Sequence, residues 1–211
     1  MYYYGDFYKL NGRPCRSTLE IVTSSVPPDA RNRLLLCQPD IVVVMMNPGA
    51  SKPCARGDGQ GWCPREVGST SEIGTEAALV PTYPDKTQLA IAEVMRRKEF
   101  GHARVLNLSD VREPKSSNFL RGLENNCLPQ GHSVFCSQRV DELEDRLKPM
   151  TEIVIAAWGT DYRLRALAKT ALVSFKSRNL RIHGWDNHPF FRHPGRNSED
   201  WLQSILPNWP C

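Results

Sequence analysis

The clearest pattern in the chain is the run of β-branched residues from Ile41 to Val44, extended by Met45 and Met46, which is typical of a strand covered on both faces in a parallel sheet. Three later segments are also expected to be strands. We expect strands at 41–46, 104–108, 153–158 and 180–183. The first stops abruptly at Asn47-Pro48-Gly49, where proline and glycine favour a sharp turn. Because ligands bind at the carboxyl ends of strands in open α/β sheets, Asn47 is suitably placed for a binding site. The simpler interpretation is an Asx turn that ends the strand.

Segments with helical spacing of apolar residues alternate with these strands. They begin near Thr87, Val140, Asp161 and Ser198, and we expect Thr87 to cap the first of them. A strand, a helix and a second strand in succession favour parallel pairing through a crossover. The pattern therefore predicts an α/β fold, a three-layer α/β/α sandwich around a central, mainly parallel four-stranded sheet.

The first residues show a different pattern. Residues 2–22 alternate around Asn11-Gly12, a dipeptide that favours the type I′ turn of a two-residue hairpin. We therefore expect an N-terminal β-hairpin in addition to the sheet. No Pro-rich or Ser-rich linker divides the 211 residues, so we expect a single domain over 1–211, of which 1–36 form the hairpin extension.

Composition narrows the class of protein only slightly. Hydrophobic residues make up 40% and charged residues 24% of the chain, as in globular domains with a core. The net charge of +4 permits a nucleic-acid partner without requiring one. The chain begins without a signal-like segment and contains no apolar run of membrane-spanning length. We therefore expect a cytoplasmic monomer with no membrane partner.

The cysteines give little support to a metal site or to disulfides. There are seven, an odd number, and no two of them form a Cys-x-x-Cys pair. Cys54, Cys63, Cys127 and Cys136 leave a four-thiolate site open, although free thiols are the simpler interpretation. We expect no metal and no cofactor.

Polar motifs follow three of the predicted strands, and parallel strands bring such ends to one edge of a sheet. The motifs are Asn47-Pro48-Gly49, Asn107, and His193-Pro194-Gly195-Arg196-Asn197. In this order, over roughly residues 40–206, they resemble the uracil-DNA glycosylase superfamily in its asparagine-using branches. The chain also looks like a little-characterised branch described mainly as a domain of unknown function. Gly195 departs from many active relatives, which have serine there, and the hairpin lies outside the resemblance.

The resemblance implies a division of roles among three side chains. Asn47 would orient a water toward the anomeric carbon, Asn107 would read a flipped pyrimidine, and His193, if neutral, would donate a hydrogen bond to the departing base. Each residue also has a simpler interpretation: an Asx turn at Asn47, a strand-to-loop tie at Asn107, and a helix or loop cap at His193.

Other residues complete the expected site. Gly49 belongs to the base pocket, and Trp62 either stacks on the base or covers the core as part of a lid. Four basic residues flank the motifs and are candidates for contacts with DNA phosphates: Lys52, Arg56, Arg192 and Arg196. Arg196 lies where relatives place the residue that wedges into the duplex. Taken singly, each of these charges is also an ordinary solvated surface residue.

The segment from Pro48 to Pro84 is long for a connection inside a domain. It contains Gly57, Gly59 and Gly61, which add flexibility without side-chain bulk. The pocket is therefore expected to accept a pyrimidine substituted at C5, as in modified phage genomes, unless the loop packs outside the pocket. A protein acting on such bases would serve in repair or in phage defence.

Three functions are compatible with these residues. The first is a monofunctional DNA glycosylase that flips out a damaged or modified pyrimidine and hydrolyses its N-glycosidic bond. The alternatives are a catalytically silent module that binds nucleic acid or nucleotides, and a hydrolase of free nucleotides. The first two differ in whether a water fits between Asn47 and the flipped sugar.

Overall fold

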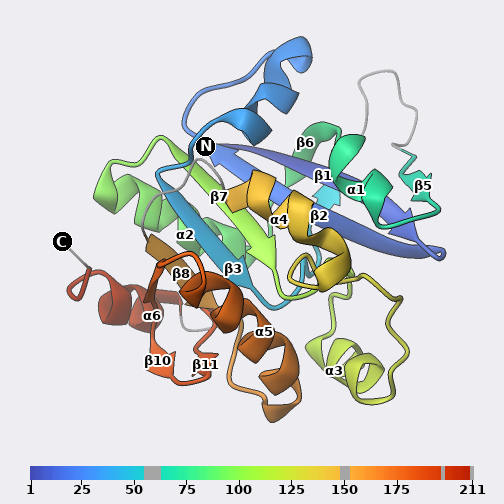
Figure 1. The fold of residues 1–211 in the computed structure, drawn as a ribbon. Coiled ribbons are helices and arrows are strands. Elements are labelled where there is room, and N and C mark those ends of the chain that lie inside the picture. Colours follow the sequence, from blue (N-terminus) through green and yellow to red (C-terminus); the bar gives the residue numbers. More distant parts are fainter. Residues whose placement is uncertain (55–62, 148–152, 196–197, 210–211) are drawn as a thin grey trace.

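A mixed nine-stranded sheet runs through the protein (Figure 1). The computed structural model describes residues 1–54, 63–147, 153–195 and 198–209. The strand order is β4-β6-β1-β2-β7-β3-β8-β9, and β5 also pairs with β1. The strands are β1 (Tyr2–Leu10), β2 (Arg13–Val22), β3 (Ile41–Met45), β4 (Lys52–Pro53), β5 (Arg65–Val67), β6 (Leu79–Tyr83), β7 (His102–Asn107), β8 (Ile153–Ala157) and β9 (Arg181–His183), with a separate hairpin of β10 (Asp186–Asn187) and β11 (Phe190–Phe191).

The prediction of a mainly parallel four-stranded sheet is wrong. The four predicted strands do form β3, β7, β8 and β9, and these strands pair in parallel in the order β7-β3-β8-β9. However, β2 continues the sheet antiparallel to β7, with Leu19 opposite Val105. Antiparallel pairs of β1 with β2, of β1 with β6 and of β4 with β6 extend it further. The α/β class holds, but the sheet is mixed and more than twice as wide as predicted.

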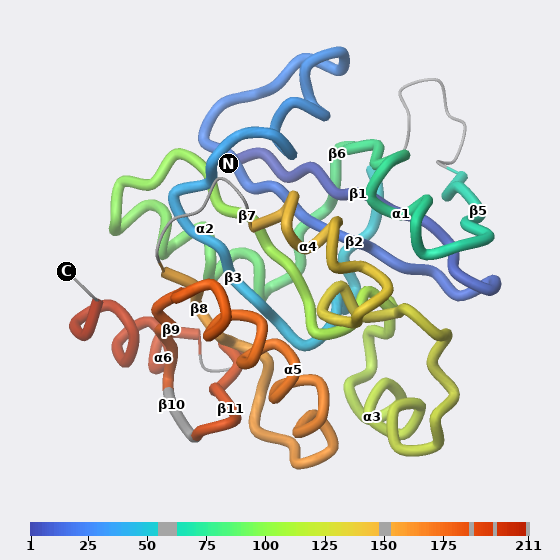
Figure 2. The backbone as a smooth tube through the Cα atoms, viewed as in Figure 1, coloured from blue at the N-terminus to red at the C-terminus, as the bar shows by residue number. Residues whose placement is uncertain are grey.

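The predicted N-terminal hairpin is confirmed, and it lies inside the sheet. Asn11 and Gly12 both have positive φ, 50° and 72°, as a type I′ turn requires. Figure 2 shows β1 and β2 (blue) running beside β7 (green). The sequence predicted that the hairpin lies outside the sheet, because only some residues of β2 are apolar. In the structure both faces of this strand are buried.

Helices cover both faces of the parallel strands. Val42 and Val44 pack on one side with α3, α4 and α5, while Ile41, Val43 and Met45 pack on the other with α2 and α6. This two-sided burial explains the uninterrupted apolar run of β3. The helices are η1 (Pro28–Leu36), α1 (Ser71–Thr75), α2 (Lys86–Lys98), α3 (Ser116–Glu124), η2 (Ser137–Arg139), α4 (Val140–Leu147), η3 (Tyr162–Leu164), α5 (Arg165–Lys176) and α6 (Ser198–Ile205). In the described part of the chain no helix is long and apolar enough to cross a membrane.

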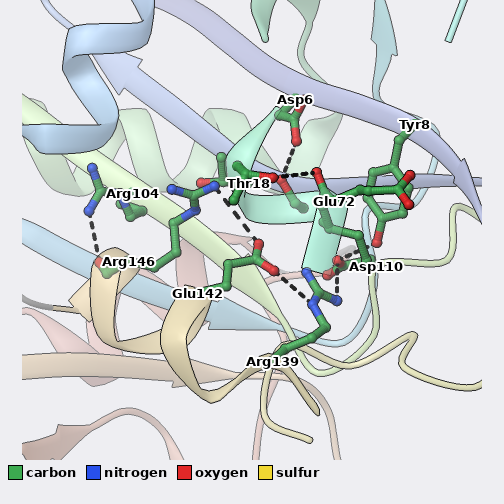
Figure 3. Close-up of polar contacts among 12 residues, drawn as sticks. Asp6, Tyr8, Thr18, Glu72, Arg104, Asp110, Arg139, Glu142 and Arg146 are labelled. Carbon is green, nitrogen blue, oxygen red and sulfur yellow. Dashed lines mark hydrogen bonds and ion pairs between the residues drawn. The ribbon is translucent and has the colours of Figure 1, made fainter. Parts of the chain in front are cut away.

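A network of buried charged side chains lies between β1, β2, β7 and α4 (Figure 3). The carboxylate of Asp110 accepts hydrogen bonds from the Tyr8 hydroxyl and from Arg139, both at 2.7 Å. Arg139 also donates to Glu142 through Nε at 2.8 Å. Burial raises the pKa of Asp110, while the Arg139 guanidinium acts in the opposite direction. Pairing of opposite charges offsets the unfavourable free energy of removing them from water, so charged residues can lie inside a sheet that is covered on both faces.

Arg104 on β7 and Glu20 on β2 form a second buried pair. Their side chains are fully buried and 2.8 Å apart, and Arg104 also donates to the carbonyl oxygens of Arg146 and Leu34. His102 lies 2.6 Å from the other oxygen of Glu20. Burial opposes ionisation of Glu20, but Arg104 and His102 together hold the pKa of this carboxyl below its usual value. The pair joins the hairpin to the parallel strands and to α4.

We expect Arg104→Met to lower the free energy of unfolding by about 3–5 kcal/mol, because Glu20 would stay buried without its guanidinium partner. Urea denaturation of the purified variant measures the change. The control is Arg96→Met, which removes an exposed guanidinium that is paired with Glu93 on the surface of α2 and should leave the unfolding midpoint nearly unchanged. Equal midpoints for both variants would show that the buried pair does not hold the hairpin in place.

Candidate active site

A cleft of about 580 Å³ opens at the carboxyl ends of β3 and β8. Its walls come from residues 45–50 after β3, 158–161 after β8, 85–88 at the start of α2, and the loop that carries His193. β7, the next parallel strand after β3, lies on one side of β3, and the later strand β8 lies on the other side. This reversal of strand order is where open α/β sheets bind ligands.

Asn47 contributes an oriented amide to the cleft. Its Nδ2 donates to the carbonyl oxygens of Val111 and Glu113, at 3.2 and 2.9 Å. Both N–H bonds are therefore used to hold the loop after β7, and the amide cannot be flipped without bringing oxygen against oxygen. No residue in the described ranges donates to Oδ1. Asn47 thus ties strand to loop and keeps one free acceptor at the cleft.

His193 lies in the same cleft with a defined tautomer. The backbone N–H of Gly195 donates to its Nδ1 at 3.0 Å, so the proton of the neutral ring is on Nε2. Burial lowers the pKa of His193, and the charge of Asp85 only partly opposes that shift. At neutral pH the ring is therefore uncharged and can donate one hydrogen bond through Nε2.

Asp85 is a cleft residue that the sequence prediction missed, and it corrects the predicted N-cap. The cap of α2 is Asp85 and not Thr87: its Oδ1 accepts from the backbone N–H of Thr87 and Gln88 at 2.9 and 3.1 Å. Gln88 completes a capping box by accepting from the Asp85 N–H at 3.0 Å. The second oxygen, Oδ2, would lie 3.0 Å from a Cβ on Gly49, whose φ is +60°. Gly49 therefore permits both the turn and the approach of the carboxylate.

Arg16 from β2 also lines the cleft. Its side chain is fully buried, and in the described structure none of its three guanidinium nitrogens has a hydrogen-bond partner. Burial lowers the pKa of Arg16 to about 10, although the charge of Asp85 opposes the shift. The guanidinium is therefore charged at neutral pH, inside the protein and unpaired.

Asn107 ends β7 beside Met45 of β3, at the same sheet edge as Asn47. It is fully buried but is not part of the cleft wall. Neither its Oδ1 nor its Nδ2 has a partner among the described residues. The strand-to-loop tie considered for Asn107 is therefore not made, and the cleft brings together Asn47, Gly49 and His193 without it.

The other predicted site residues fall outside the cleft or outside the described residues. Lys52 is exposed on β4, with its ammonium 5.9 Å from the ring centre of Tyr83. Arg192 is exposed and lies over Trp185, with its guanidinium carbon 4.6 Å from the ring centre. The predictions for Arg56, Trp62 and Arg196, and for the glycines at 57, 59 and 61, concern residues outside the described ranges. No group of three or more His, Cys, Asp or Glu side chains in the described structure is arranged to hold a metal ion.

The two missed residues left signals of different strength in the sequence. Asp85 precedes Gln88 by three positions, which is the capping-box spacing at the start of an apolar helical pattern. Arg16 gave no comparable signal, because an arginine in an isolated hairpin is expected on the solvent face. Its burial becomes evident only in the structure, where its backbone N–H donates to the carbonyl oxygen of Asp110, beyond the end of β7.

No protein-family model, curated protein or solved structure matches this chain.

We expect Asp85→Ala to lower the free energy of unfolding by about 1–2 kcal/mol, because it removes the cap of α2. Thr87→Ala should have little effect, since only the backbone of Thr87 takes part in the cap. Asp85→Asn keeps a capping oxygen and should retain most of the stability while losing the negative charge. Thermal and urea unfolding of the three variants tests this order, and a larger loss for Thr87→Ala would contradict it.

Proposed function

We propose that the protein is a DNA glycosylase that hydrolyses the N-glycosidic bond of a modified pyrimidine turned out of the duplex. The observation that carries this proposal is the arrangement of acceptors and a donor in one cleft: Asn47 Oδ1 and Asp85 Oδ2 accept, and His193 Nε2 donates. Hydrolysis needs acceptors to hold a water and a donor for the departing base.

In this mechanism the bond between C1′ and the base nitrogen breaks, and its electron pair leaves with the base. Water adds its oxygen to C1′ and gives up a proton, and the base anion is finally protonated by solvent. Asn47 orients the water, and the Asp85 carboxylate attracts the proton that the water loses, a role that an amide cannot fill. Neutral His193 donates to a base oxygen as negative charge grows there.

A C5-substituted pyrimidine is the preferred base in this proposal. The basis is the sequence alone: the long segment after Asn47 contains glycines at 57, 59 and 61, which add no side-chain bulk. The substrate panel below includes C5-substituted bases for that reason.

A hydrolase acting on free nucleosides or nucleotides is a second candidate. Two features of the cleft favour it. Its volume of about 580 Å³ is in the range of small-molecule sites. Its wall includes Asp85, Glu113 and Asp161, acidic residues that repel a DNA backbone.

The decisive experiment incubates the protein with end-labelled duplexes that each carry one altered pyrimidine, and then cleaves abasic sites with alkali. We expect cleavage of at least one duplex and a fall of about 100-fold or more in the single-turnover rate for Asn47→Ala. To test the second candidate, the protein is incubated with free deoxyuridine or its monophosphate, and any released base is separated by chromatography. Base release from these two compounds but from no duplex would show that the substrate is a free nucleoside or nucleotide and not DNA.

Arg196→Ala is the matched control for this prediction. If Arg196 contacts DNA, this variant should weaken duplex binding and keep the single-turnover rate at saturation, whereas Asn47→Ala should keep binding. Equal losses of binding in both variants would show that the two roles are wrongly assigned. If no duplex and no nucleotide gives a product, the remaining function is that of a catalytically silent module that binds nucleic acid or nucleotides.

His193 gives the reaction an expected pH dependence. Its pKa is lowered by burial, so the active neutral form persists below the usual pKa of histidine and is lost only as the pH falls through the lowered value. Protonation puts a second donor on Nδ1, opposite the Gly195 N–H, and breaks that contact. The profile of kcat/KM should therefore decline on the acid side below pH ~6.5, and His193→Gln should lack that limb. A rate that rises as the pH falls through this region would contradict the donor role.

A further inference from the structure

Arg16 differs from two other buried arginines, Arg104 on β7 and Arg139 on η2. Arg104 and Arg139 are equally inaccessible, and each has a carboxylate at 2.7 or 2.8 Å. The backbone N–H of Arg16 is satisfied by the Asp110 carbonyl oxygen at 2.9 Å. Its guanidinium nitrogens have no partner in the described structure. A buried cation without a partner is strongly unfavourable, so a group that meets it in the bound state is expected.

The charged groups nearest Arg16 leave its guanidinium without an ion-pair partner in the described structure. Asp110 is bonded to Arg139 and Tyr8, and Asp85 Oδ1 is used by the N-terminus of α2. Arg112 adds a second positive charge and is held by the Ser51 carbonyl oxygen at 2.8 Å. Asp85 attracts Arg16 but does not reach ion-pair distance. A ligand with one negative charge would supply the partner that the Arg16 guanidinium lacks.

We propose that Arg16 binds the departing pyrimidine as an anion and stabilises the negative charge that develops on it during bond cleavage. This inference rests on the proposed function, which creates such an anion in the same cleft. The charge of a pyrimidine anion is shared between ring nitrogen and the neighbouring carbonyl oxygen, and a planar guanidinium matches two adjacent acceptors. Neutral His193 then supplies a directional hydrogen bond, and Arg16 supplies the opposite charge.

The test compares two free bases at pH 8: 5-nitrouracil, which is an anion under these conditions, and uracil, which is neutral. By calorimetry, the unmodified protein should bind 5-nitrouracil about 10- to 100-fold more tightly than uracil. Arg16→Gln should lose that preference, and Arg16→Lys should keep part of it. Arg96→Gln removes the same charge at an exposed position and should behave as the unmodified protein does.

Measurements of thermal stability and of turnover distinguish an anion-binding role of Arg16 from a purely structural role. Without ligand, Arg16→Gln should melt no lower than the unmodified protein, because it relieves an unpaired buried charge. Saturating 5-nitrouracil should raise the melting temperature of the unmodified protein more than uracil does, a measurement that needs no variant. In turnover, Arg16→Gln should slow release of uracil more than release of 5-nitrouracil, which leaves readily without help.

The outcomes distinguish this inference from the proposed function. If no substrate is turned over but 5-nitrouracil binds through Arg16, the glycosylase proposal fails and Arg16 remains an anion receptor. If turnover is found but both bases bind equally, and Arg16→Gln slows both leaving groups equally, the role of Arg16 is refuted and the function stands. Stabilisation by inorganic phosphate alone would assign Arg16 to a phosphate and overturn the inference.

Discussion

The antiparallel pairing of β2 with β7 is the constraint on which the rest of the structure depends. It inserts the N-terminal hairpin into a sheet that is covered on both faces, so charged residues of β2 lose contact with solvent. Glu20 responds by pairing with Arg104 across the same two strands. Arg16, near the start of β2, is carried to the carboxyl end of β7 and therefore to the cleft. One strand pairing thus supplies both a stabilising contact and an unpaired charge at the candidate site.

The apolar pattern predicted β3 and β8 well because burial on both faces leaves an unambiguous signal. Residues 41–45 are apolar without interruption, and each packs against a helix layer. The position of the hairpin was not predictable in the same way. In β2 the polar residues Arg16, Thr18 and Glu20 are buried. Glu20 pairs with Arg104, far along the chain, so local alternation gives the wrong face to solvent. Strands β4 and β5, of two and three residues, have patterns too brief to distinguish from irregular chain.

The candidate site was predictable where a residue follows a strand and uncertain where the role depends on neighbours. Asn47 and His193 share the cleft because strand order brings their loops together. Asn107 follows a strand at the same edge, yet its buried amide is not part of the cleft wall. An unsatisfied buried amide is unfavourable by about 1–3 kcal/mol, a penalty that a water or a shift of the loop after β7 would remove. Asn47 holds that same loop through the carbonyl oxygens of Val111 and Glu113.

The internal position of the hairpin also affects how the chain is made. β2 is complete early in synthesis, but its outer edge remains without hydrogen-bond partners until His102 and the rest of β7 have left the ribosome. An open strand edge of this length invites pairing with other chains. The buried charges on β2 reduce that hazard, since Glu20 and Arg16 are unfavourable in a chance strand pairing that does not offer matching groups. The same residues that make the native sheet specific therefore protect the nascent chain from forming the wrong one.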